Sequence, residues 1–189
     1  MSEFGTESHR LFLAVAIPDG TRRDLSKELE VFFENEEMPG RPVRPANWHL
    51  TLRFLGDTPV DDIPHIREAL RRAPLPASFP LRFDGLGAFR NPTSATVLWI
   101  NLVDPAERLA QLAAAMNRAL EQIGIPPNTR PFVGHLTISR IRKPQNLGRL
   151  MHRFKSKTPP FSVHEAILFR SHLGQGPARY EVLERYSLV

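Results

Sequence analysis

Cysteine is absent from this chain of 189 residues. Its absence excludes disulfides, thiolate metal sites and cysteine nucleophiles. The chain also lacks an apolar run long enough to cross a membrane, and its first ten residues, MSEFGTESHR, lack the apolar core of a signal peptide. We therefore expect a cytoplasmic, monomeric protein without a membrane segment. Residues 1–9 are expected to be disordered, and residues 10–189 to form a single domain.

Acidic residues are missing from one long stretch, Gln122–His164. The region of the first predicted helix is, by contrast, rich in glutamate. The acid-free stretch carries eight cations: Arg130, Arg140, Arg142, Lys143, Arg149, Arg153, Lys155 and Lys157. Such uneven charge predicts a polyanionic partner, which we interpret as nucleic acid rather than as a sign of a generic basic surface.

A short pattern of alternating polar and apolar residues occurs twice in the chain. It reads His49-Leu50-Thr51-Leu52 in the first half and His135-Leu136-Thr137-Ile138 in the second. Alternation with a period of two is typical of a half-buried strand. Each strand would therefore carry its histidine and threonine on one face and its two aliphatic side chains on the other.

The two motifs belong to a longer internal repeat with an offset of 86 residues. With this offset the apolar run Leu11–Ile17 falls on Val97–Val103, and each run is followed by a helical pattern and then by an HxTx strand. A repeat of this length indicates a duplicated lobe rather than a solenoid. Two lobes packed about a pseudo-two-fold axis would bring the histidines together, although chance similarity of two ordinary α/β segments is the alternative.

Strands and helices are interleaved along the chain, which predicts an α+β fold with antiparallel sheets. We expect two pseudo-symmetric lobes, each a sheet with helices packed on its outer face and with the active-site groove between them. The predicted helices cover 21–37, 61–72, 105–123 and, more weakly, 147–154. The predicted strands cover 11–17, 49–55, 81–89, 95–103, 132–141, 161–169 and 180–188.

Two histidines that face one groove can divide acid–base work between them. The unperturbed pKa of histidine lies near neutrality, so one ring can accept a proton while the other donates one. In-line cleavage of a phosphodiester needs such groups on opposite sides of phosphorus, and hydroxyl and guanidinium groups can hold its other oxygens. Because more cations lie near His135 in the sequence, we expect His135 to be the neutral base and His49 the acid.

A metal site is the competing interpretation of the histidines. It would need three or more His, Asp or Glu ligands, and carboxylates are scarce around both motifs. The chain also lacks the P-loop and GxGxxG patterns that bind nucleotide phosphates. We therefore expect no metal and no cofactor.

The quoted motifs and their surroundings resemble a known family. HLTLRFLGD at 49–57 and RPFVGHLTISR at 130–140 are similar to the paired signatures of the two-histidine phosphoesterase superfamily. Within it the chain looks most like the RNA 2′,3′-cyclic phosphodiesterases, also called 2′,5′-RNA ligase-like proteins. LFLAVAIPD, LGAFRNPTSATVLWINL and FRSHLGQGPARYEVLERYSL fit the same branch, so the resemblance spans residues 10–189.

The resemblance implies a bilobal fold. It also implies a metal-independent enzyme that hydrolyses terminal 2′,3′-cyclic phosphates of RNA, tRNA fragments among them, to 2′-phosphates. It also implies ATP-independent 2′,5′ ligation by some members. Carried over residue by residue, it gives an acid/base pair, phosphate ligands and groove residues. These are His49 and His135 as the pair; Thr51, Thr137 and Arg130 on phosphate; and Phe12, Phe132, Ser171 and Tyr180 on the substrate. Gly134 departs from the family, which usually has proline before the second histidine.

Core packing is the alternative for Phe12, Phe132 and Tyr180. A non-catalytic RNA-binding module is the alternative for the whole chain and would explain its basic stretch. Such a module uses exposed stacking aromatics, yet the chain has two Trp, two Tyr and no RNP-like run. A protein-interaction domain with two incidental HxTx strands is a third interpretation.

Overall fold

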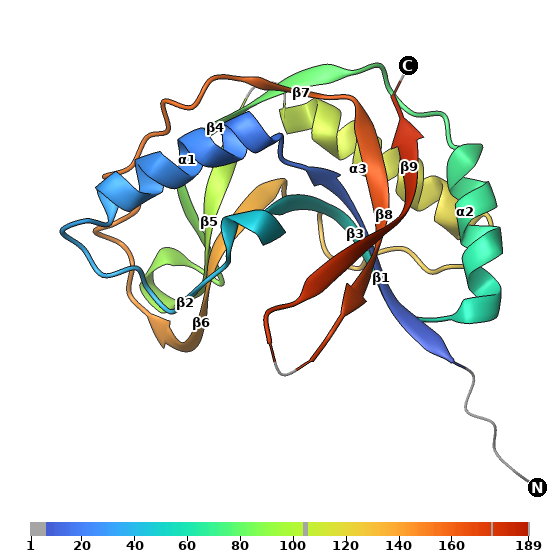
Figure 1. Cartoon of the computed structure of the whole chain (residues 1–189), viewed down its shortest axis with the longest axis horizontal. Helices are drawn as coiled ribbons and strands as arrows, with labels where there is room; N and C mark the ends of the chain where they lie inside the picture. The colour runs from blue at the N-terminus through green and yellow to red at the C-terminus, as the bar shows by residue number, and fades with distance from the viewer. Residues whose placement is uncertain (1–6, 104–105, 175, 189) are drawn as a thin grey trace, which may run out of the picture.

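The computed structural model describes residues 7–103, 106–174 and 176–188 (Figure 1). Strands and helices alternate along them, as the α+β prediction requires. The strands are β1 (Ser8–Ala16), β2 (Arg41–Pro42), β3 (His49–Pro59), β4 (Phe79–Phe89), β5 (Ala95–Val103), β6 (His135–Gln145), β7 (Phe161–Val163), β8 (Glu165–His172) and β9 (Arg179–Ser187). The helices are α1 (Asp19–Phe32), α2 (Ile63–Arg71) and α3 (Ala106–Glu121), with 3₁₀ turns η1 (Pro45–Asn47), η2 (Val60–Asp62) and η3 (Pro92–Ser94).

The strands form one antiparallel sheet whose centre is the meeting of the two HxTx strands. The order is β7-β4-β5-β6-β3-β1-β8-β9, with β2 paired to β6. β3 and β6 share one residue pair, Leu50 opposite Leu136. Because the strands run in opposite directions through this pair, it marks the pseudo-two-fold axis between the two halves of the sheet. The duplicated architecture predicted from the repeat is therefore confirmed.

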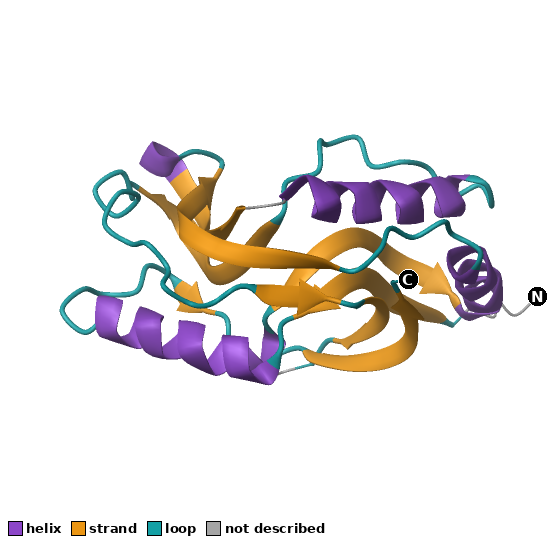
Figure 2. Cartoon of the chain, turned by 90° about the horizontal axis from the view of Figure 1, so that it is seen from above, coloured by secondary structure: helices purple, strands orange, loops and turns teal. Residues whose placement is uncertain are grey.

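The helices cover the sheet in an exchanged arrangement that the repeat does not reveal. α1 follows β1 in the chain but packs beside the other half, where Phe32 contacts Phe154 and Glu28 accepts hydrogen bonds from Ser156 and Lys157. α3 follows β5 but contacts β3 and α2. Figures 1 and 2 show α1 on one side of the molecule and α2 and α3 on the other. Each sequence repeat thus contributes to both spatial lobes.

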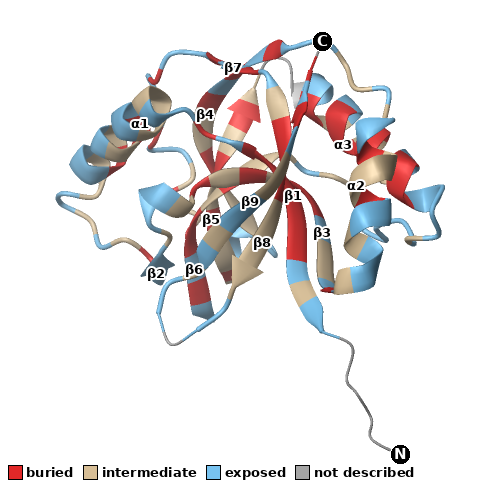
Figure 3. Cartoon of the chain, turned by 45° about the vertical axis from the view of Figure 1, so that its right-hand side comes forward, coloured by how far each residue is buried: buried red, intermediate tan, exposed pale blue. Residues whose placement is uncertain are grey.

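The helix-covered face of the sheet holds a single apolar core that runs through both halves. Burial is heaviest along β1 and on the inward sides of the helices, as Figure 3 shows. In β3 and β6 the leucines of the motifs point into this core, and Leu50 and Leu136 are fully buried. The histidines and threonines of the same strands are half-buried on the opposite face, as the alternation predicted.

A bulge at the last residue of each motif reverses the alternation at equivalent positions. In β3 the partners of β1 skip Leu52, and in β6 the partners of β5 skip Ile138. An unpaired extra residue turns the following side chains to the other face of the strand. Arg53 and Ser139 are consequently buried in the core, while Phe54 and Arg140 face outward. Strict alternation from His49 would put Arg53 on the histidine face, and the bulge is the reason that it lies on the other one.

The bulge in β6 is covered by the loop before β3. The Val43 amide donates to the Ile138 carbonyl at 2.8 Å, and the Ser139 hydroxyl donates to the Pro39 carbonyl. Gly40 has a φ of 74°, and an added Cβ there would lie 2.5 Å from the carbonyl oxygen of Arg140. The loop and the bulge therefore fix the backbone of Arg140 together.

Three expected segments differ from the structure. Residues 147–154 form turns rather than a helix, closed by short-range bonds such as the Leu150 amide to the Leu147 carbonyl. The strand expected over 161–169 is divided at His164, because β7 pairs with β4 whereas β8 pairs with β1 and β9. Residues 8 and 9, expected to be disordered, begin β1. The expectation of disorder for residues 1–6 concerns a part of the chain outside the described residues.

Replacing Gly40 by alanine should destabilise the protein strongly. The positive φ alone costs about 1–3 kcal/mol for a residue with a Cβ, and the contact with the Arg140 carbonyl adds to it. Gly20→Ala is the matched control, because a Cβ at Gly20 meets nothing within 4 Å. Urea unfolding of both variants checks this, and equal stabilities would contradict the proposed role of the loop.

Candidate active site

The two motifs open into one pocket of about 330 Å³ on the outward face of the central strands. Six of the nine predicted site residues line it: His49, Thr51, Arg130, His135, Thr137 and Tyr180. The remaining lining residues are Val43, Asn47, Phe54, Phe89, Val97 and Arg140. This set of residues is called the histidine groove below. It contains two imidazoles, two threonine hydroxyls and two guanidinium groups, and no carboxylate.

Both imidazoles are held by the same backbone interaction. Nδ1 of His49 lies 2.8 Å from the Asn47 carbonyl, and Nδ1 of His135 lies 2.7 Å from the Val133 carbonyl. A carbonyl only accepts, so Nδ1 carries the proton in each ring. Nε2 is then the nitrogen left for a ligand on each side. The equivalence of these bonds follows from the duplication, since each carbonyl lies two residues before its histidine.

Aromatic side chains hold each ring from the flanks. The His49 ring lies 4.9 Å from Phe12 and 5.3 Å from Tyr180, measured between centroids. The His135 ring lies 4.7 Å from Phe89 and 5.5 Å from Trp99, mostly edge to face. Trp99 in turn covers Gly87, where an added Cβ would come within 2.6 Å of the indole. The two imidazoles are therefore confined by packing as well as by hydrogen bonds.

Burial lowers the basicity of both histidines. Desolvation is the largest cause of the lowered pKa of His49, which is about 4; the hydrogen bond to the Asn47 carbonyl opposes it, and Arg140 and His135 act in the same direction as burial. Burial and then Arg140 also lower the pKa of His135. Both rings are thus neutral at physiological pH when the groove holds no anion. The expected contrast in cationic surroundings is absent, because the same Arg140 acts on both rings.

Arg140 and Phe54 belong to the histidine groove but were not among the predicted site residues. They occupy equivalent positions in the repeat, one after each bulge. Alternation from the histidines places both on the buried face, so only recognition of the bulges could have found them. Arg140 supplies a cation to the centre of the groove. Phe54 has 59% of its surface exposed and offers an aromatic face to a ligand.

Three of the predicted substrate residues do not line the groove. Phe12 is buried behind His49 and stacks on Phe169, so it acts as support for the ring. Phe132 lines a different pocket against α3, which shares Arg130 with the groove. Ser171 is half-buried on β8 opposite Tyr180, outside the groove lining. Tyr180, for which core packing was the favoured alternative, does line the groove.

The basic stretch is divided by the fold. Arg130 and Arg140 lie in the histidine groove, whereas Arg153 forms an ion pair with Glu36, just after α1. The eight cations are therefore not gathered at one place, since Arg153 and its neighbours pack beside α1 and β4.

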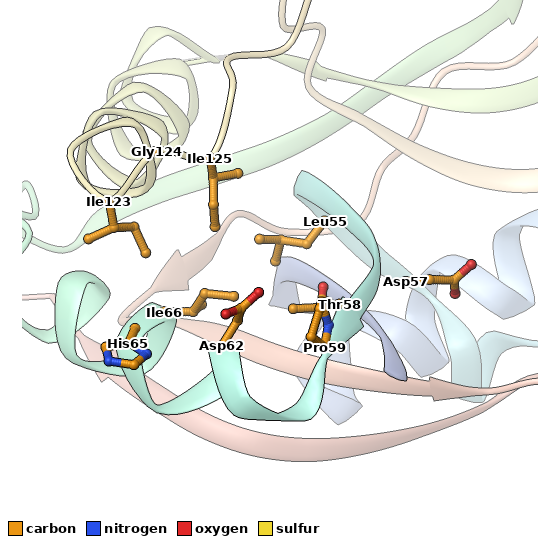
Figure 4. A pocket seen from close by; sticks show the side chains of 10 residues that line it. All are labelled: Leu55, Asp57, Thr58, Pro59, Asp62, His65, Ile66, Ile123, Gly124 and Ile125. Carbon is orange, nitrogen blue, oxygen red and sulfur yellow. The ribbon is translucent and has the colours of Figure 1, made fainter. Parts of the chain in front are cut away.

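A different pocket of about 490 Å³ lies between the end of β3, α2 and the end of α3 (Figure 4). Its apolar side chains include Leu55, Ile66 and Ile125, and two aspartates lie among the lining residues. In Figure 4 the Asp57 carboxylate points away from the other side chains. The acidic groups among its lining residues disfavour a phosphate in this pocket.

Two further searches concern only the described residues. No group of three His, Asp or Glu side chains is placed to hold a metal ion in them. Among their helices, none combines the length and the apolar content needed to cross a bilayer.

Comparison with known proteins places these features in a family. The sequence model of LigT-like phosphoesterases matches residues 15–99 and 100–178, so that each match contains one HxTx motif. The RNA 2′,3′-cyclic phosphodiesterase of Archaeoglobus fulgidus is 32% identical over 79% of this chain and 82% of its own. Its Escherichia coli counterpart is 28% identical over 97% and 99%.

Solved structures agree with the sequence relatives. The crystal structure of E. coli LigT complexed with 3′-AMP has a TM-score of 0.76 and 26% identity, covering 96% of this chain and 99% of that one. A protein of Thermus thermophilus has a TM-score of 0.74 and 29% identity, covering 95% and 97%.

The low pKa of His49 predicts a loss of stability in acid. The pKa is about 4 in the folded protein and ordinarily 6.5, so the unfolded chain binds more protons between these values. The free energy of unfolding should therefore fall as the pH is lowered from 6.5 toward 4. His49→Gln should flatten this dependence, whereas His65→Gln on the exposed face of α2 should not. Urea titrations across the pH range test this, and parallel curves for His49→Gln and the parent protein would refute it.

Proposed function

The chain belongs to the LigT-like phosphoesterase family, and we propose that it hydrolyses terminal 2′,3′-cyclic phosphates of RNA to 2′-phosphates. The sequence relatives bear the name of this activity. The proposal rests mainly on the matched pair of histidines. In each of them Nδ1 donates a hydrogen bond to a backbone carbonyl, which leaves Nε2 for a ligand in a groove lined by no carboxylate. A merely RNA-binding protein has no need of two such rings.

The proposed reaction is a single in-line displacement at phosphorus. Nε2 of one neutral histidine takes a proton from water as the water oxygen forms a bond to phosphorus. The bond from phosphorus to the ribose 3′ oxygen breaks on the opposite side. Nε2–H of the other histidine, in its protonated form, gives its proton to that oxygen. The products are a 2′-phosphate and a 3′-hydroxyl, and the proton balance is closed by exchange with solvent.

The acid form of one histidine is generated by the substrate itself. Burial and Arg140 keep both rings neutral unless an anion binds beside them. A cyclic phosphate is a monoanion, and a negative charge beside an imidazole raises its pKa. Binding therefore supplies the proton donor where the reaction needs it. Because Arg140 acts on both rings, the charge around them does not decide which histidine is the acid.

The remaining groups of the groove would hold the phosphate. Thr51 and Thr137 lie one on each motif, on the same face as the histidines. Their hydroxyls, with the guanidinium groups of Arg130 and Arg140, can donate to the non-bridging oxygens as charge builds up on them. Phe54 offers a stacking surface for the terminal base. These groups would stabilise the transition state without a metal ion.

We extend the proposal to ligation. If the 5′-hydroxyl of a second RNA takes the place of water, the same displacement forms a 2′,5′ phosphodiester and frees the 3′-hydroxyl. The cyclic phosphate supplies the energy, so ATP is not consumed.

Removing either imidazole should abolish most of the activity. His49→Ala and His135→Ala should each lower kcat on an RNA ending in a 2′,3′-cyclic phosphate by about 10²–10⁴-fold, because each removes one proton-transfer group. The assay is run in EDTA, where the parent protein should keep its full rate. His65→Ala is the control for loss of an exposed histidine.

Two outcomes would count against the mechanism. Near-normal turnover by either histidine variant would exclude a paired acid and base. Loss of the parent activity in EDTA, with recovery on adding a divalent metal, would exclude the metal-independent reaction.

A further inference from the structure

A second pocket of about 340 Å³ adjoins the histidine groove. The two share Val43, Asn47, Arg140 and Tyr180 in their walls. The second pocket is completed by the loop around β2 and by the turn before β9. Its own residues are Arg41, Pro42, Arg44, Gly176, Pro177 and Ala178. A ligand in the groove can therefore extend into this neighbouring space past Arg140. The second pocket is called the arginine pocket below.

Every charged side chain of the arginine pocket is a guanidinium. Arg41, Arg44 and Arg140 line it, and no lining residue is acidic. None of the ion pairs found among the described residues involves these three arginines; Arg67 and Arg71, for example, pair with Glu184. Three arginines without a carboxylate among the residues that line the pocket create a positive field at its mouth. Arginine is also the side chain best suited to hold phosphate through two parallel hydrogen bonds.

The backbone forces two of these arginines together. Arg41 of β2 lies directly opposite Arg140 of β6 in antiparallel register. Like charges in opposite positions of a sheet repel each other. The register cannot slip to relieve this repulsion, because Gly40 and the bond from Val43 to Ile138 fix the loop against the bulge. An anion between the guanidinium groups would remove the repulsion.

The side of the arginine pocket formed by the turn before β9 is also fixed to the groove. The Asn47 amide group donates to the Ala178 carbonyl at 2.8 Å. This bond ties the residue two positions before His49 to the turn that leads into Tyr180. Asn47 also supplies the carbonyl that holds the His49 ring. Asn47 therefore positions both the His49 ring and one side of the arginine pocket.

We propose that the arginine pocket binds the internucleotide phosphate that precedes the terminal nucleotide of the RNA substrate. The inference rests on the proposed function, which places the cyclic phosphate between His49 and His135. The next phosphate along the chain is one nucleotide away, and Arg140 borders both positions. Arg41 and Arg44 then determine specificity: they favour an RNA end over a cyclic mononucleotide, which has no second phosphate.

The test compares three substrates: two dinucleotides that differ only in the charge of the linking phosphate, and a mononucleotide that lacks the preceding nucleotide altogether. They are 2′,3′-cyclic AMP, the dinucleotide ApA ending in a 2′,3′-cyclic phosphate, and the same dinucleotide with an uncharged methylphosphonate linkage. For the double variant Arg41→Ala/Arg44→Ala, KM for the natural dinucleotide should rise about tenfold, the loss expected for charged hydrogen bonds to phosphate. Its kcat should hold, and its kinetics on the mononucleotide and the methylphosphonate should match those of the parent.

Control variants separate charge from shape. Arg41→Lys/Arg44→Lys should recover part of the lost affinity, because the charge remains and the paired donors do not. Arg149→Ala, an exposed arginine outside both pockets, should leave all three substrates unaffected. Equal loss on the mononucleotide and the dinucleotide, or an unchanged KM for the dinucleotide, would overturn the proposal.

A binding measurement keeps this inference separate from the proposed function. The probe is the dinucleotide ApA carrying a terminal 2′-phosphate, titrated into the parent protein and the double variant at several salt concentrations. Weaker binding and a shallower salt dependence in the variant support the arginine pocket, and identical isotherms refute it. If the parent protein hydrolyses none of the substrates, the proposed function fails while these isotherms still decide on the pocket.

Discussion

The pairing of Leu50 with Leu136 at the centre of the sheet is the contact on which the site depends. It joins the two halves of a duplicated fold by their equivalent strands, and it buries both leucines completely. Because the strands are antiparallel, the register of this pair puts His49 beside Thr137 and His135 beside Thr51 on the neighbouring strand. The pairing that buries the two leucines therefore also places the two imidazoles and the two hydroxyls on one face of the sheet. All four groups lie on strands rather than on loops.

The two bulges give the two sides of this symmetric site different side chains. They turn Phe54 outward in one half and Arg140 outward in the other. One side of the groove thus gains an aromatic face and the other a guanidinium that influences both histidines. Burial makes the rings poor proton acceptors in the absence of an anion, so the field of the phosphate becomes part of the acid–base machinery. Duplication supplies the pair of histidines, and divergence after the bulges supplies the difference between the two sides.

Much of this arrangement could be predicted from the sequence, because it rests on periodicity. The HxTx alternation gave the strands, their buried leucines and the face of the histidines, and the 86-residue offset gave the duplication. Features that depend on long-range register could not be predicted in this way. The bulges at Leu52 and Ile138 put Arg53 in the core and Arg140 in the groove, the opposite of what strict alternation predicts. No local sequence pattern indicates that α1 and α3 pack against the opposite halves of the sheet. Phe132 was assigned to the groove by resemblance, yet its loop directs it against α3.

The proposed mechanism requires both histidines to be in the same state, with Nδ1 protonated and Nε2 available to the phosphate. Nitrogen-15 NMR of labelled histidines measures this directly, with His49→Gln and His135→Gln used to assign the signals. The mechanism predicts that both rings are the neutral Nδ1–H tautomer at neutral pH, that both titrate below the ordinary pKa of 6.5, and that inorganic phosphate raises both pKa values. A neutral ring protonated at Nε2, or a pKa that does not respond to phosphate, would contradict it.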